Sequence, residues 1–210
     1  MQDVRPNVRG SLVMLLTLAS GAVLAQEAPA YNPAARAMVR DAAAWDALLK
    51  GDILVETVPV PGSNIPRAVL HAVIEAPPAR IWAVVSDCSN YKKNMPRIAE
   101  SQQLKREGDD VTCRIVADMP FPLSNTTNIS RAHHTVADGV YKREWKMVEG
   151  DYKSNEGSWV VAPLDPAGTR SLVVYTIHIV PTTPVPGFMM AMGTKQTLPG
   201  MIHGLRKQMK

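Results

Sequence analysis

The chain has 210 residues, of which 46% are hydrophobic and 20% are charged, and its formal net charge at pH 7 is +4. A chain of this length and composition can bury one sizeable core, so we expect a single domain, and we expect it to be a monomer. The basic residues are scattered rather than clustered with stacking aromatic residues, which excludes a typical nucleic-acid-binding surface. The small positive charge favours only a transient contact with anionic membrane surfaces.

The first part of the chain has a pattern of its own. Arg5 and Arg9 precede an apolar run over residues 12–19, and small residues lead up to Ala25. A basic start, a short apolar core and a small-residue cleavage site are typical of a secretory signal peptide. The run is shorter than the ~20 apolar residues that a membrane-spanning helix needs; a retained N-terminal anchor is the alternative. We therefore predict a signal peptide over residues 1–25 and an exported protein, periplasmic in a Gram-negative bacterium and otherwise secreted.

The mature chain, residues 26–210, begins with a predicted helix over residues 33–50. Pro33 stands at its start, its body is rich in alanine, and Gly51 ends it. Apolar residues recur at helical spacing on one face, so we expect this helix to pack on the outer face of a sheet.

A strand, a two-proline junction and a helix follow one another between Val69 and Pro96. Apolar side chains occur on both faces of residues 69–76, which predicts a partly buried strand. Pro77 and Pro78 fit the first turn of a helix, where the missing N–H has no partner to lose. The apolar stripe that follows predicts a short helix directly after them.

Most of the chain as far as Pro181 is predicted to be β-structure, because short alternating segments are separated by glycine-containing turns. The candidate strands are residues 53–60, 69–76, 99–107, 110–118, 126–134, 140–149, 153–162 and 169–180. Residues 185–210 carry apolar side chains at helical steps and predict one long closing helix, bent at Pro199. The pattern predicts an α+β fold, with a core over residues 53–210 in which a curled antiparallel sheet of about seven strands wraps around that helix.

A series of short motifs occurs in a fixed order between Trp45 and Lys210. The motifs are Ile74-Glu75-Ala76-Pro77-Pro78 before Ile81-Trp82, Asp87 with Tyr91 and Pro96, Gly157-Ser158-Trp159, Gly168-Thr169-Arg170 with Tyr175, Val185-Pro186, and Leu198-Pro199 with Leu205-Arg206. In these residues the chain resembles the START and polyketide-cyclase (SRPBCC) superfamily of helix-grip proteins, and in particular its bacterial exported lipid-binding members. The resemblance implies a cavity for an apolar molecule between the sheet and the terminal helix.

The chain departs from the pattern of this superfamily in two places. Cys88 stands where relatives often carry a bulky aromatic residue. Residues 121–127 lack the Arg-Asp pair that relatives often show after a Trp/Phe-Pro turn. These departures imply a different polar wall in the cavity.

Cys88 and Cys113 are the only cysteines, and an exported chain meets an oxidising compartment. A disulfide between them requires Cα atoms within about 7 Å of one another. The sequence does not show whether they meet, so two buried free thiols remain the alternative. Their spacing fits no metal site.

No catalytic residue and no cofactor is assigned. His133 and His134 are adjacent in a strand and point to opposite faces, so they cannot hold one metal together. The sequence contains no Gly-x-Ser-x-Gly motif, no glycine-rich phosphate loop and no Cys-x-x-Cys pair.

The candidate ligand-binding residues are the large apolar side chains that the resemblance places beside the cavity. They are Met119, Phe121, Trp145, Trp159, Tyr175, Phe188, Met189 and Met192. Each of them could equally fill a packed core. Four charged residues lie in central strands, and one turned inward could hold the polar head of a ligand, because a buried charge demands a partner. These four are Arg114, Arg131, Arg143 and Glu144.

The segment 185–192 is predicted to be a movable lid over the cavity. Prolines precede it, and Gly187 and Gly193 flank its methionines, which weakens a helix because glycine costs about 1 kcal/mol relative to alanine. Weakened elements open more readily than the core.

Three functions are compatible with the sequence. The resemblance implies a non-catalytic carrier or sensor of a hydrophobic small molecule such as a lipid, a sterol-like compound or a quinone. A cyclase or dehydratase of the same superfamily is the second hypothesis, against which stand the predicted export and the lack of an evident acid–base pair. The third hypothesis is an interaction domain with a filled core.

Overall fold

The computed structural model describes Met1 and residues 31–121, 123–185 and 193–210. The predicted signal peptide lies outside these residues and stays a prediction. In the described part of the chain, no helix is both long enough and apolar enough to cross a membrane.

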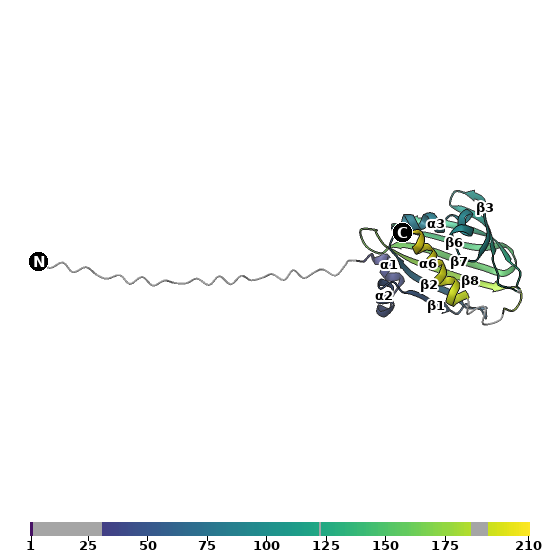
Figure 1. Ribbon diagram of the computed structural model, residues 1–210, viewed down its shortest axis with the longest axis horizontal. Coiled ribbons are helices and arrows are strands. Elements are labelled where there is room, and N and C mark those ends of the chain that lie inside the picture. Colours follow the sequence, from purple (N-terminus) through teal and green to yellow (C-terminus); the bar gives the residue numbers. More distant parts are fainter. Residues whose placement is uncertain (2–30, 122, 186–192) are drawn as a thin grey trace.

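The core of the fold is one antiparallel sheet of eight strands, against about seven predicted, in the order β1-β2-β8-β7-β6-β5-β4-β3 (Figure 1). Its strands are β1 (Ile53–Val58), β2 (Arg67–Ile74), β3 (Ile98–Glu107), β4 (Asp110–Ala117), β5 (Thr126–Ala137), β6 (Val140–Gly150), β7 (Tyr152–Pro163) and β8 (Ser171–Pro181). Strands β3 to β8 form a meander, and the β1–β2 hairpin joins its far edge through β8.

Tight turns set the register of this meander. The β5–β6 hairpin turns at Asp138 and Gly139, whose φ angles are 52° and 75°. Two consecutive positive φ angles are the mark of a type I′ turn, which matches the right-handed twist of the flanking strands. Gly108, with φ 59°, makes the corresponding turn between β3 and β4.

The outer face of the sheet is covered by two short helices, α1 (Pro33–Met38) and α2 (Ala42–Leu49). The prediction of one helix over residues 33–50 is therefore wrong. Asp41 accepts a hydrogen bond from the backbone N–H of Ala44 at 2.7 Å, and such an N-cap starts a second helix instead of continuing the first. Trp45 and Leu48 pack with outward-facing side chains of β2, β7 and β8, on the face predicted for this segment.

The concave face of the sheet holds the helices that follow β2 and that close the chain. They are α3 (Pro78–Val85), the 3₁₀ turn η1 (Cys88–Asn90), α4 (Tyr91–Asn94), the π-helical turn η2 (Gly193–Thr197) and α6 (Leu198–Gln208). Figure 1 shows α6 lying across the strands of the sheet. Ile81 of α3 and Ile202 and Leu205 of α6 are fully buried with Leu70 of β2.

The closing helix differs in part from its prediction. The α-helix begins at Leu198, after η2, and residues 186–192 lie outside the described residues. Pro199 is the second residue of α6, and the π-helical turn η2 runs directly into this helix. The proline therefore stands close to the change from π-helical to α-helical structure, and the bend at Pro199 stays a prediction.

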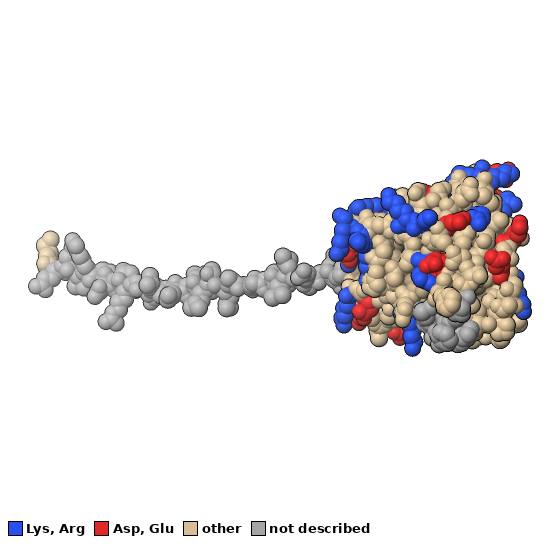
Figure 2. All heavy atoms as spheres, turned by 45° about the vertical axis from the view of Figure 1, so that its right-hand side comes forward, with Lys and Arg blue, Asp and Glu red and all other residues tan. Residues whose placement is uncertain are grey.

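Charged side chains on one face of the molecule are mixed with uncharged surface (Figure 2). On the face shown in Figure 2, acidic and basic residues lie among broad stretches of uncharged surface.

Candidate functional site

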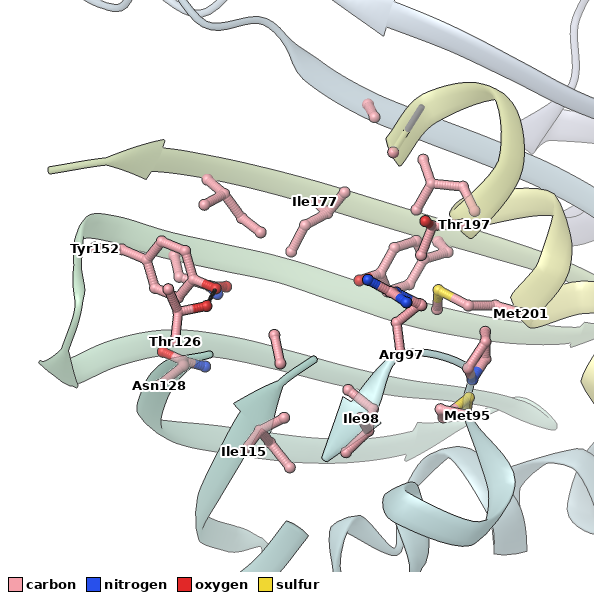
Figure 3. Close-up of a pocket in the computed structure, with 18 of the residues that line it drawn as sticks. Met95, Arg97, Ile98, Ile115, Thr126, Asn128, Tyr152, Ile177, Thr197 and Met201 are labelled. Atoms are coloured by element: carbon pink, nitrogen blue, oxygen red, sulfur yellow. Dashed lines mark hydrogen bonds between the residues drawn. The ribbon is translucent and has the colours of Figure 1, made fainter. Parts of the chain in front are cut away.

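A cavity of about 470 Å³ lies between the concave face of the sheet, α4 and the N-terminal end of α6. Every strand of the sheet contributes at least one residue to its wall. Figure 3 shows Ile177 on one side of this space and Ile98 and Ile115 on the other, with their side chains directed into it. A cavity of this size, mostly apolar with a few polar groups, is typical of small-molecule sites.

The cavity begins where the close packing of α6 ends. Ile202 and Leu205 are fully buried against α3 and the sheet. Leu198 and Met201, one turn nearer the start of the helix, border the cavity instead. The same helix therefore closes the core at one end and forms part of the cavity wall at the other.

Three aromatic residues form a continuous part of the wall. The ring centroids of Trp159 and Tyr175 are 4.4 Å apart, and those of Trp145 and Tyr175 are 5.8 Å apart. Gly157, opposite Trp145 in the β6–β7 pair, makes room for the indole, because a Cβ at this position would overlap with that ring. Trp145 Nε1 donates to Asn155 Oδ1 at 3.1 Å, so its polar edge is satisfied.

Polar side chains from β5 form a second part of the wall. Thr126, Asn128 and Ser130 alternate along the strand and all line the cavity. Thr126 is hydrogen-bonded to the hydroxyl of Tyr152, as Figure 3 shows. Asn128 is 8% exposed, and its Oδ1 is buried without a hydrogen-bond partner among the described residues.

Arg143 on β6 is the charged residue that turns inward. It is 3% exposed and lines the cavity. Its Nη1 donates to His134 Nε2 at 2.8 Å, and its Nη2 donates to Cys113 Sγ at 3.2 Å. No carboxylate of the described part of the chain lies within 4.0 Å of its guanidinium.

The other three charged candidates point away from the cavity. Arg114 pairs with Glu100, and Arg131 pairs with Asp110. Glu144 pairs with a lysine of its own strand.

His134 is a neutral acceptor for Arg143. A guanidinium has N–H donors and no acceptor, so Nε2 of His134 must be unprotonated to receive the bond. Burial, together with the charge of Arg143, lowers the pKa of His134 from 6.5 to about 4. The imidazole therefore does not repel the neighbouring cation at neutral pH.

Cys88 and Cys113 are joined by a disulfide, with their Cα atoms 6.3 Å apart. Both are fully buried. The bond ties η1 to β4 directly beside Arg143, and α4, which follows η1, lines the cavity.

An ion pair stands at the rim of the cavity. Arg97 Nη1 lies 3.1 Å from Asp118 Oδ2, and the backbone N–H of Asp118 donates to the carbonyl of Arg97 at 2.9 Å. These contacts join the start of β3 to the end of β4. In Figure 3 the side chain of Arg97 extends toward Thr197, at the start of α6.

The structure brings together four of the eight candidate ligand-binding residues. Met119, Trp145, Trp159 and Tyr175 all line the cavity. The prediction that Phe121 lines it is wrong, because this residue is 96% exposed in the loop between β4 and β5. The remaining three candidates, Phe188, Met189 and Met192, and almost all of the predicted lid lie outside the described residues.

Sequence reasoning missed the polar residues of β5 and did not single out Arg143. A usable signal existed for both. Arg143 stands two residues before Trp145 on one strand, so the two side chains share a face. The alternation of Thr126, Asn128 and Ser130 marks the same face of β5.

Among the described residues, no group of three or more His, Cys, Asp or Glu side chains is placed to hold a metal ion. The described wall of the cavity carries apolar, hydroxyl, amide and guanidinium groups and the carboxylate of Asp118.

A sheet that grips a terminal helix and encloses a cavity defines a START-like helix-grip protein. The sequence profile of the family described as polyketide cyclase / dehydrase and lipid transport matches residues 74–206. The chain belongs to this family. No curated protein matches it in sequence.

Solved structures share this fold at low sequence identity. The STAR-related lipid transfer protein of Xanthomonas axonopodis (fragment 25–204) is 20% identical with a TM-score of 0.65, over 75% of this chain and 93% of that one. Human StAR-related lipid transfer protein 5 is 12% identical with a TM-score of 0.63, over 84% and 96%. The ZhuI aromatase/cyclase of Streptomyces sp. R1128 is 14% identical with a TM-score of 0.55, over 68% and 92%. Carriers and an enzyme therefore share the architecture.

Proposed function

We propose that this protein binds a hydrophobic small molecule in the cavity and carries it without changing it chemically. The observation that carries this proposal is a cavity of about 470 Å³ on the concave face of the sheet, with aromatic and aliphatic side chains in its wall. A ligand that covers the apolar surface of this cavity removes that surface from water, which contributes roughly 25 cal/mol of binding free energy per Å². Membership of a family that includes lipid transport supports the same conclusion.

The titratable groups of the wall support a carrier rather than an enzyme. General acid–base catalysis needs a group whose pKa lies near the working pH. Burial raises the pKa values of Tyr91, Tyr152 and Tyr175, so these phenols stay protonated at neutral pH. Among the described wall residues, Asp118 carries the one carboxylate, and it is held by Arg97 at the rim.

The proposal includes export of the mature protein. The buried disulfide between Cys88 and Cys113 supports it, because such bonds persist in oxidising compartments and are rare in the cytosol. N-terminal sequencing of protein recovered outside the cytoplasm should begin near Gln26. A mature protein that begins at Met1 would contradict the signal peptide.

The proposal also includes transient contact with a membrane, from which a carrier must load its ligand. Met119 and Pro120 line the cavity, and Phe121 and Leu123 of the same loop are exposed. Exposed apolar side chains beside an apolar cavity support a contact of this loop with a lipid surface.

Native mass spectrometry of protein purified from its own compartment tests the carrier function. We expect a co-purifying apolar ligand that is released unchanged on denaturation. Uptake of a fluorescent fatty acyl probe by the delipidated protein should restore the bound state. Conversion of the ligand into a product during incubation would contradict the non-catalytic function, and a protein that neither co-purifies with nor takes up any apolar molecule would favour a filled interaction domain.

A further inference from the structure

We propose that the ligand is an amphiphile with a carboxylate head, and that this carboxylate binds Arg143 inside the cavity. The inference rests on the proposed function, because it places the ligand in the same cavity. It goes further in fixing the charge of the head group and its position.

Arg143 is a buried cation without a buried anion. It is 3% exposed, and its two hydrogen-bond partners, His134 Nε2 and Cys113 Sγ, are both uncharged. Burying an isolated charge is costly unless an opposite charge or several hydrogen bonds compensate it. A sulfur atom is a weak acceptor, so the compensation that the protein itself supplies is incomplete.

The guanidinium has donors left for a ligand. It carries five N–H groups, of which the two contacts with His134 and Cys113 use two. A planar fork of N–H groups matches the two oxygens of a carboxylate, and such charge-assisted pairs are among the strongest hydrogen bonds in proteins. Because Arg143 also lines the cavity, a ligand inside it can reach these donors.

The charge balance favours a carboxylate over a phosphate monoester. Arg143 and Arg97 are the two basic residues of the described wall, and Arg97 is paired with Asp118 at the rim. One uncompensated positive charge is neutralised by one carboxylate, whereas a phosphate monoester carries about −1.5 to −2 near pH 7. The phosphate of a phosphodiester carries an organic substituent on each side, and this bulk does not suit a guanidinium as buried as that of Arg143, which is 3% exposed.

Asn128 is a second, independent sign of a ligand. It is 8% exposed in the same wall, and its Oδ1 lacks a donor among the described residues. The guanidinium of Arg143 contacts Cys113, which lies opposite Ser130 in the β4–β5 pair. Asn128 is two residues from Ser130 on β5, so the Cα atoms of these two residues are about 7 Å apart at the strand rise. A donor on the ligand, or a water molecule that it traps, completes the hydrogen bonding of Asn128.

A matched pair of fluorescent probes tests this assignment. cis-Parinaric acid and its methyl ester share one hydrocarbon chain and differ in the charge of the head. We expect the delipidated protein to bind the acid at least tenfold more tightly than the ester at pH 7.5. The Arg143→Met variant should lose this preference by weakening for the acid alone, and the Arg131→Met variant, altered at an exposed arginine of the neighbouring strand, should keep it.

A competition series on the parent protein needs no variant to fold. Dodecanoic acid should displace the bound acid more strongly than dodecanol, dodecylamine or dodecyl phosphate. Equal binding of acid and ester, or stronger displacement by the alcohol, the amine or the phosphate, would overturn the carboxylate assignment while leaving the proposed carrier intact. Failure of every probe to bind would instead overturn the proposed function, and this inference with it.

Discussion

Arg143 donates to His134 Nε2 at 2.8 Å across the β5–β6 pair, and this contact binds a buried cation to a buried histidine. The contact requires a neutral imidazole, because the guanidinium offers only donors. The ring of Trp82 on α3 packs edge-on against the same imidazole, with ring centroids 5.0 Å apart. Helix α3 therefore covers this pair on the concave face of the sheet. Protonation of His134 would therefore remove the acceptor of this hydrogen bond and place a second positive charge beside Arg143, which would lower the stability of the fold.

Mild acid should destabilise the protein through His134. Its pKa is lowered from 6.5 to about 4 in the folded state. Above pH 6.5 the imidazole of His134 is neutral in both the folded and the unfolded chain, so its titration takes nothing from the free energy of unfolding. Between pH 6.5 and about 4 the unfolded chain binds a proton that the folded chain does not, so the free energy of unfolding falls, by on the order of 3 kcal/mol at most. Urea unfolding from pH 7.5 to 4.5 measures this slope.

The adjacent histidine supplies the control for this prediction. The His134→Gln variant keeps an acceptor for Arg143 but has no titrating group, so its slope should be shallower than that of the parent. The His133→Gln variant, altered at an exposed neighbour on the opposite face, should keep the steeper slope. Identical slopes for the parent and His134→Gln would show that other groups cause the acid sensitivity.

Removal of the disulfide should lower stability and loosen the cavity wall. Cys88 and Cys113 are separated by 25 residues, and closing a loop of this length in the unfolded chain is worth roughly 3 kcal/mol. The Cys88→Ser/Cys113→Ser double variant should lose about this much in urea unfolding. Because Tyr91 and Met95 follow η1 and line the cavity, probe affinity should fall as well. Unchanged stability in the double variant would show that the folded chain does not depend on the bond.

The strands could be predicted closely because their turns carry their own chemistry. Asp138 and Gly139 adopt the positive φ angles that a two-residue hairpin needs, and the residues around them alternate in polarity. The N-terminal helix was less predictable. Asp41 lies within a helical pattern of apolar residues, and only the hydrogen bond to Ala44 shows that it begins a new helix.

The wall of the cavity could be predicted only in part, because a period of two residues fixes which side chains share a face and not which face is concave. Trp145 and Tyr175 could be named because they are large apolar side chains that the family resemblance places beside the cavity, and both line it. Phe121 was misplaced because it follows the end of β4, where no strand period constrains its side chain. The two-residue turn at Asp138 and Gly139 fixes the register of β5 with β6 and so places His134 opposite Arg143, but the sequence alone does not show that this pair lies on the concave face.

A methyl group at Gly157 should damage the aromatic wall. An added Cβ would overlap with the backbone oxygen of Thr176 and with the ring of Trp145, and neither the strand nor the packed indole can move away cheaply. We expect Gly157→Ala to lower the free energy of unfolding by about 1–3 kcal/mol and to reduce probe binding. Gly204→Ala is the matched control, because its nearest contact would be an ordinary 3.7 Å and alanine favours a helix. A stable Gly157→Ala variant with normal binding would show that the wall tolerates repacking.

Replacement of Phe121 should impair the exchange of ligand with membranes while leaving binding in solution intact. Phe121 is 96% exposed and follows Met119 and Pro120, which line the cavity, so it stands beside the opening without forming the wall. An apolar side chain at this place gains free energy by entering a lipid surface, whereas a serine does not. The Phe121→Ser variant should therefore transfer a fluorescent fatty acid between vesicles several-fold more slowly than the parent, with the same affinity for the probe in the absence of vesicles.

The Val136→Ser variant is the matched control, because Val136 is 59% exposed near the opposite end of β5, on the order of 30 Å from the loop at the strand rise. Equal transfer rates for the parent and both variants would show that ligand exchange does not depend on this loop, and weaker binding by Phe121→Ser in solution would show that the side chain reaches the cavity after all.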